Sequence, residues 1–288
     1  MSDKRILIVA ETLRERLQSP DWLAVDCRSD LFDPDAGRSM YVDEHIPGAV
    51  FLDLDKDLSA PVTAGTGRHP LPDVDDVVRR FEELGVGNTN KIVVYDGSNG
   101  ALAARAWWML RWLGHDDVYL LDGGIDRWRT LGFPLERGMK TRPGASFRAS
   151  PRDHLVLTTA ELAADPSAIG KMNLIDARDA VRFRGEEEPI DTVAGHVPGA
   201  RNAPFADFVN PDGTWRDRNE RRRLLVDVLG SDKPSAWSVM CGSGVTACHL
   251  AISGLEAGLP EPRLYVGSWS EWIRDPERPN GLGDADLP

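Results

Sequence analysis

Cysteine, excess positive charge and long hydrophobic runs are scarce in this sequence, and each shortage excludes a class of protein. The 288 residues include 3 cysteines, too few for a disulfide framework and without a CxxC pair or a zinc ligand set. No apolar run approaches the roughly 20 residues that a membrane-spanning helix needs. Because 46 Asp and Glu outnumber 34 Lys and Arg, the formal net charge is -12, which opposes nonspecific binding to nucleic acid or an anionic membrane. An anionic substrate would therefore need locally placed arginines.

The amino-terminal segment favours a cytoplasmic location. Lys4 and Arg5 are followed by only 5 apolar residues before Glu11, fewer than a signal-peptide core contains. An intracellular chain with few cysteines raises the question of whether one of them is a nucleophile. No glycine-rich dinucleotide fingerprint or cluster of metal ligands stands out in the sequence, so we expect neither a cofactor nor a metal.

Two long stretches of the chain resemble each other, which indicates a duplicated domain. The first half contains VDCR, EHIPGA and VVYDGSNG, and the second half contains IDAR, GHVPGA and SVMCGSGV in the same order. The offset between matching residues is 150 from Asp26 to Asp176 and 145 from Asp96 to Cys241. Asp96 thus stands where the second repeat has a cysteine, so the first repeat lacks that thiol.

Each repeat has the pattern of an α/β domain. Apolar runs too short for helices alternate with longer helical patterns. The expected strands include 23–25, 92–95, 118–121, 174–175 and 237–240, and the expected helices include 101–113 and 245–257. We therefore predict two domains, each a mostly parallel sheet flanked by helices on both faces, with functional loops at the carboxyl ends of the strands. Their expected bounds are 1–140 and 158–288, with a linker at 141–157.

Cys241 occupies the most informative position in the sequence. An apolar strand ends at this cysteine, Gly242 and Gly244 permit a tight loop with inward backbone amides, and a helix follows. Inward N–H groups and the positive end of a helix dipole favour negative charge on the sulfur. We therefore expect Cys241 to be a nucleophile rather than a small core residue.

Two hydrolytic chemistries fit this loop poorly. A phosphatase loop of this kind carries an arginine six positions after the cysteine, where this sequence has Ala247. A nucleophile-elbow hydrolase requires a G-x-S-x-G or G-x-C-x-G sequence, whereas Met240 and Gly242 flank Cys241 in a different pattern. Hydrolase and phosphatase activities are therefore disfavoured.

The CGSGVTAC loop, the paired EHIPGA and GHVPGA segments, the paired VDCR and IDAR segments and the terminal GSWSEW together resemble the tandem-domain rhodanese family of sulfurtransferases. The resemblance covers nearly the whole chain, and the CGSGVTA loop is similar to that of 3-mercaptopyruvate sulfurtransferases. It implies that Cys241 takes a sulfane sulfur from a small donor, holds it as a persulfide and passes it to cyanide, a small thiol or thioredoxin. The implied donor is 3-mercaptopyruvate, with thiosulfate as the alternative; a noncatalytic persulfide carrier is a second class.

The resemblance also implies residues that bind and polarise the donor. Arg182 matches a family arginine that meets the donor carboxylate, Arg184 lies two residues further on, and a second family arginine is replaced by Asp191. The implied catalytic set joins Ser243 to Asp55 and His69 of the first domain. The expected donor site is completed by the loop residues Gly242, Gly244, Val245 and Thr246.

Several repeated residues have structural interpretations. His45 and His196 precede Pro-Gly turns in both halves, including the half without the nucleophile, so we expect them to hold those turns. The same argument predicts fold-holding ion pairs within 26–28 and 176–178. The basic run 221–223 is expected to be a solvated helix face rather than a nucleic-acid-binding patch.

Overall fold

In a computed structural model that describes residues 5–164 and 166–284, the chain divides into two units with separate sheets. Unit 1 comprises 1–60, 71–152 and 209–215, and unit 2 comprises 61–70, 153–208 and 216–288. The segment 61–70 therefore folds with the second repeat although it lies within the first. Residues 1–4, part of the segment that favours a cytoplasmic location, lie outside the described residues. Within the described ranges, no helix has both the length and the hydropathy of a membrane span.

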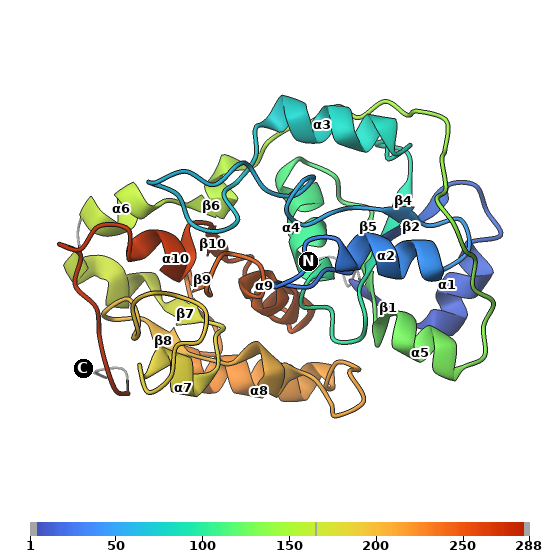
Figure 1. Cartoon of the computed structure of the whole chain (residues 1–288). Helices are drawn as coiled ribbons and strands as arrows, with labels where there is room; N and C mark the ends of the chain where they lie inside the picture. Colours follow the sequence, from blue (N-terminus) through green and yellow to red (C-terminus); the bar gives the residue numbers. More distant parts are fainter. Residues whose placement is uncertain (1–4, 165, 285–288) are drawn as a thin grey trace. The chain divides into compact units, whose positions relative to one another are not determined.

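Unit 1 contains a five-stranded sheet in which every pairing is parallel, in the order β1-β5-β4-β2-β3 (Figure 1). Its strands are β1 (Leu7–Ile8), β2 (Trp22–Asp26), β3 (Val50–Phe51), β4 (Lys91–Tyr95) and β5 (Val118–Leu121). Its helices are α1 (Ala10–Arg16), α2 (Ala36–Asp43), α3 (Val74–Glu83), α4 (Ala103–Trp112) and α5 (Gly124–Thr130). The predicted strands and helix in this half are confirmed.

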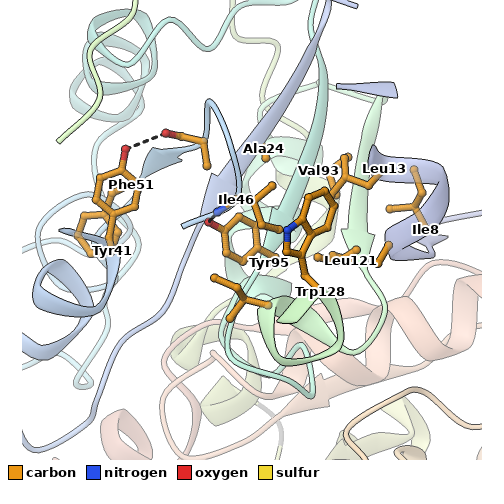
Figure 2. Close-up of a cluster of buried hydrophobic side chains, with 13 residues drawn as sticks. Ile8, Leu13, Ala24, Tyr41, Ile46, Phe51, Val93, Tyr95, Leu121 and Trp128 are labelled. Atoms are coloured by element: carbon orange, nitrogen blue, oxygen red, sulfur yellow. Dashed lines mark hydrogen bonds between the residues drawn. The ribbon is translucent and has the colours of Figure 1, made fainter. Parts of the chain in front are cut away.

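The core of unit 1 follows from the alternation of side chains along its strands. Ala24, Val93 and Leu121 face one side of the sheet and pack against apolar residues of α1, α2 and α5 (Figure 2). In this cluster the Tyr41 hydroxyl donates to the Ala49 carbonyl oxygen at 2.7 Å. Helix α4 contacts β4 and β5, and the intervening strand residues are buried as well. The sheet is therefore covered on both faces.

Unit 2 repeats this arrangement with a parallel sheet in the order β6-β10-β9-β7-β8 (Figure 1). Its strands are β6 (Val156–Leu157), β7 (Leu174–Asp176), β8 (Arg201–Asn202), β9 (Ser238–Met240) and β10 (Arg263–Tyr265). Its helices are α6 (Thr159–Ala164), α7 (Ala180–Phe183), α8 (Arg218–Leu229), α9 (Ala247–Glu256) and α10 (Ser268–Trp272), with 3₁₀ turns η1 (Asp153–Leu155), η2 (Pro166–Met172) and η3 (Phe205–Phe208). One core cluster joins the sheet to α6, α7 and α10, and α8 packs beside α9, which contacts β9 and β10.

The predicted ion pairs are present and buried in both units. Arg28 Nη2 lies 2.6 Å from an Asp26 carboxylate oxygen, and Arg178 Nη2 lies 2.7 Å from Asp176. In each pair the arginine Nη2 also donates to a backbone carbonyl oxygen. The pairs therefore tie the carboxyl ends of β2 and β7 to neighbouring loops.

Both repeated histidines make the structural contacts expected of them. His45 Nδ1 lies 2.8 Å from the Tyr41 carbonyl oxygen, and His196 Nδ1 lies 2.8 Å from the Phe183 carbonyl oxygen. Each ring is also stacked on the neighbouring aromatic side chain. These contacts fix the segments that carry the Pro-Gly turns.

The expectation of a solvated face for 221–223 is wrong for Arg221. This side chain is 2% exposed, and its Nη2 lies 3.1 Å from a Glu256 oxygen of α9. It stands one helical turn before the buried Leu225 on α8, so helical periodicity places both residues on the inward face. Arg223, two positions further on, is exposed.

The substitution Arg28→Gln should destabilise unit 1 by about 3 kcal/mol, because it leaves the buried Asp26 carboxylate without its cation. The matched control is Arg79→Gln, which removes an exposed arginine 3.0 Å from Asp76 and should change stability by less than about 0.5 kcal/mol. Urea unfolding of both variants measures the difference. Equal stabilities would mean that the buried pair is not needed to hold the fold.

Candidate active site

The backbone of Cys241 is held by the first turn of α10. Cys241 follows β9 directly and is 2% exposed. Its amide donates to Ser268 Oγ at 3.1 Å, and its carbonyl oxygen accepts from the Trp269 amide at 3.0 Å. The Gly242 carbonyl oxygen accepts from the Ser270 amide at 2.9 Å. These bonds fix the start of the loop independently of any ligand.

The sulfur of Cys241 faces the interior of its own loop. The Gly244 amide donates to Sγ at 3.2 Å, and α9 begins three residues later at Ala247. Gly244 has φ +77°, and a Cβ there would lie 2.7 Å from the Val266 carbonyl oxygen, so glycine is required. Val245 is buried and Thr246 is the residue before α9. The loop therefore presents a backbone donor and a helix amino terminus to the sulfur.

The matching loop of unit 1 holds an anion of its own. Asp96 follows β4, is 2% exposed, and its carboxylate accepts from the amides of Gly100 at 3.0 Å, Leu102 at 2.9 Å and Ala103 at 3.1 Å. Burial raises the pKa of Asp96, and these amide bonds act in the opposite direction. Three backbone amides thus converge on one carboxyl side chain at the position equivalent to Cys241.

Ser268 has a strained backbone that its repeat partner avoids. Its φ is +53°, and the equivalent residue of unit 1, at an offset of 144, is Gly124 with φ +54°. An ordinary side chain in this region costs about 1–2 kcal/mol. The Ser268 hydroxyl accepts from the Cys241 amide and donates to the Tyr265 carbonyl oxygen at 2.8 Å. Unit 2 thus has serine at the position where unit 1 has glycine, and the serine hydroxyl holds the Cys241 loop.

Ser243 and His69 lie within hydrogen-bond distance of each other. Ser243 Oγ is 2.7 Å from His69 Nδ1, and both residues are buried. His69 belongs to the segment 61–70 of unit 2, which α10 holds through the bond from the Arg68 amide to Ser270 Oγ at 3.0 Å. Asp55 belongs to unit 1, where partial burial, followed by the charge of Asp53, raises its pKa. The role of Asp55 stays a prediction.

The two predicted arginines are both paired with carboxylates. Arg182 Nη2 lies 2.7 Å from Glu188 Oε1 and 3.2 Å from Asp191 Oδ2. Arg184 Nε lies 2.7 Å from Glu186 Oε1. Asp191, which stands at the position of the expected second arginine, is therefore an anchor for Arg182.

A third arginine, which the sequence analysis did not select, approaches the loop. Arg68 pairs through Nη1 with Asp191. A Cβ at Gly242 would lie 2.7 Å from Arg68 Nη2 and 3.7 Å from Arg182 Nη2, so both guanidinium groups lie beside this glycine. In the sequence, the only indication that Arg68 lies near the site is its position directly before His69 in GRHPLP.

The described part of the chain contains no group of three or more His, Cys, Asp or Glu residues that could hold a metal ion. The groups described above at the candidate site are the thiol of Cys241, the hydroxyl of Ser243, the imidazole of His69 and the guanidinium groups of two arginines. Together they suit a cysteine nucleophile that acts on a small anion, at the carboxyl end of a parallel strand.

This combination of fold and site is that of a rhodanese-type α/β protein. The family model for the rhodanese-like domain matches residues 9–131 and 159–275, and the chain belongs to this family.

Individual relatives cover almost the whole chain. A Pseudomonas aeruginosa protein named as a probable 3-mercaptopyruvate sulfurtransferase is 47% identical over 96% of this chain and 98% of its own length. The thiosulfate sulfurtransferase of Cricetulus griseus is 32% identical over 92% of this chain and 94% of its own length. The crystal structure of SseA from Escherichia coli, described as a 3-mercaptopyruvate sulfotransferase, superposes with a TM-score of 0.81 at 31% identity, over 93% of this chain and 100% of that chain.

The strain at Ser268 predicts different stabilities for two substitutions that both remove its hydroxyl. Ser268→Gly removes the strain of a side chain at positive φ, whereas Ser268→Ala keeps that strain. The glycine variant should therefore be more stable than the alanine variant by about 1 kcal/mol. Both variants should alkylate at Cys241 with iodoacetamide at a rate different from that of the unmodified chain, because both lose the bond to the Cys241 amide. Equal stabilities in thermal unfolding would contradict the strain.

Proposed function

We propose that this protein is a sulfurtransferase that moves a sulfane sulfur from 3-mercaptopyruvate to a thiophilic acceptor through a persulfide on Cys241. The observation that carries the proposal is that the buried Cys241 sulfur accepts a hydrogen bond from the Gly244 amide. The equivalent loop of unit 1 holds a carboxylate in the same way. Family membership and the relatives named above support the same activity. The proposed catalytic domain is unit 2, which comprises 61–70, 153–208 and 216–288, and its segment 61–70 supplies His69.

In the first half-reaction the Cys241 thiolate attacks the sulfur of 3-mercaptopyruvate. The new S–S bond forms as the C–S bond breaks, and the electron pair of the C–S bond passes to the enolate of pyruvate. The proton of the donor thiol is transferred to the enolate carbon that carried the sulfur. The products are therefore pyruvate and an anionic Cys241 persulfide. No external oxidant or reductant is needed.

In the second half-reaction an acceptor attacks the outer sulfur of the persulfide. Cyanide becomes thiocyanate, a thiol becomes a hydropersulfide, and in each case the electron pair of the S–S bond returns to Cys241 as thiolate. Small thiols and a reduced thioredoxin are the proposed physiological acceptors, in keeping with the proposed cytoplasmic location.

The loop of unit 1 indicates how the persulfide is stabilised. A carboxylate oxygen of aspartate and the outer sulfur of a cysteine persulfide are both three bonds from Cα. Asp96 collects three backbone amides at that distance. We infer that amides of the Cys241 loop receive the outer sulfur in the same way, so the anionic intermediate has donors in place before it forms.

Ser243 is proposed to donate its hydroxyl to the developing enolate oxygen. Its bond to His69 Nδ1, at 2.7 Å, orients the hydroxyl and can relay the proton that the enolate takes up. Asp55 is proposed as the third member of this set. Arg182 is proposed to meet the donor carboxylate, with Arg184 as a second candidate and Gly242, Val245 and Thr246 lining the loop.

Thiosulfate is the second candidate donor, because Asp191 occupies the position of an expected carboxylate-binding arginine and already pairs with Arg182. Attack on its outer sulfur would release sulfite and give the same persulfide. A noncatalytic persulfide carrier would load in this way once and then stall when offered small acceptors, whereas an enzyme would turn over repeatedly.

Incubation with 3-mercaptopyruvate alone should add the mass of one sulfur to the peptide that contains Cys241. Cys241→Ser should abolish this addition, because a serine hydroxyl cannot form the persulfide. Cys27→Ser, which replaces a buried thiol of unit 1, is the matched control and should still load. Peptide mass spectrometry reads the result, and sulfur retained by Cys241→Ser would overturn the proposal.

Ser243→Ala should lower kcat/KM for 3-mercaptopyruvate about 100-fold, the effect of losing one donor to a developing oxyanion. The loss with thiosulfate should be much smaller, because its reaction forms no enolate. Pyruvate release and thiocyanate formation at fixed cyanide measure the two reactions. Equal losses with both donors would remove Ser243 from the proton and enolate chemistry.

A further inference from the structure

Within the part of the chain that the structure describes, one edge of the Arg68 guanidinium group has no protein partner. Nη1 is paired with Asp191. Among the residues that the structure describes, Nε is buried and has no hydrogen-bond partner. Nε and Nη2 form the side-on edge of a guanidinium group, which matches the two oxygens of a carboxylate.

The same edge is occupied in the other arginines near the loop. Arg178 uses Nε and Nη2 to bind Asp176, and Arg182 uses them to bind Glu188. The more exposed Arg184 uses them to bind Glu186. Arg68 therefore differs from these three arginines in having this edge available for an external carboxylate.

The available edge lies beside the reacting group. Arg68 Nη2 would be 2.7 Å from a Cβ at Gly242, the residue after the nucleophile. Burial lowers the pKa of Arg68, and the charge of Cys241 is the largest opposing influence, which agrees with this proximity. The Asp191 carboxylate is shared between Arg68 and Arg182, so its negative charge is already compensated by two cations.

We propose that Arg68 joins Arg182 at the donor carboxylate and binds it through the Nε–Nη2 edge, with Asp191 as the positioning residue that holds the Arg68 guanidinium in place. This inference rests on the proposed sulfurtransferase function and deepens it, since it makes Arg68 a determinant of preference for α-keto acid donors. Glycine at 242 leaves the space in which this edge meets the donor.

The test compares two donors that differ only in the carboxylate. Mercaptoacetone has a methyl group where 3-mercaptopyruvate has the carboxylate, and it retains the ketone and the thiol. The unmodified chain should prefer 3-mercaptopyruvate in kcat/KM. Arg68→Gln should reduce the ratio of kcat/KM for the two donors about 10- to 100-fold, as expected for one charge-assisted hydrogen-bonded pair. Arg68→Lys keeps the charge without the fork and should give an intermediate ratio.

Arg223→Gln is the matched control, because it removes one exposed positive charge from unit 2 and should leave the ratio within about twofold. A parallel loss with both donors in Arg68→Gln, or no preference for 3-mercaptopyruvate in the unmodified chain, would overturn the role of Arg68. The donor preference of the unmodified chain is measured without any variant, so this test applies even where a substitution impairs folding. Absence of the Cys241 persulfide with either donor would instead overturn the proposed function.

Discussion

The site depends on two backbone hydrogen bonds that tie the loop after the central strand to the first turn of the last helix in the same unit. In unit 2 the Trp269 and Ser270 amides bind the carbonyl oxygens of Cys241 and Gly242, at 3.0 and 2.9 Å. In unit 1 the Ile125 and Asp126 amides bind the equivalent carbonyl oxygens at 3.0 and 2.9 Å. With its carbonyl groups held outward by these bonds, the loop can turn amides toward the side chain of its first residue. Both repeats therefore build an anion site, whichever residue fills it.

The two repeats differ in what they do with this site. Unit 1 fills it with the carboxylate of Asp96, which makes the loop a self-sufficient structural element. Unit 2 fills it with the shorter side chain of Cys241, so fewer donors are satisfied by the chain itself. The unit with the thiol also carries Ser268 in a left-handed conformation where its repeat has glycine. Backbone strain at this point accompanies the change from a loop that holds a carboxylate to a loop that holds a thiol.

Much of the fold and the centre of the site could be predicted from the sequence, because they depend on local patterns. Apolar runs such as 92–95 form buried strands, and the glycines around Cys241 predict a tight loop before a helix. The burial of Arg221 could not be predicted from composition, because a run of three arginines suggests an exposed helix face. The helical period nevertheless places the first of the three on the inward face. Arg68 was missed because its approach to Gly242 depends on the path of the segment 61–70, which no local pattern encodes.

The path of the segment 61–70 has a consequence for how the chain can be divided. The unit that holds the thiol is discontinuous in sequence, since 61–70 belongs to it although it is encoded within the first repeat. A fragment cut at the junction between the repeats would retain Cys241 and Ser243 but would lack the imidazole partner of that serine.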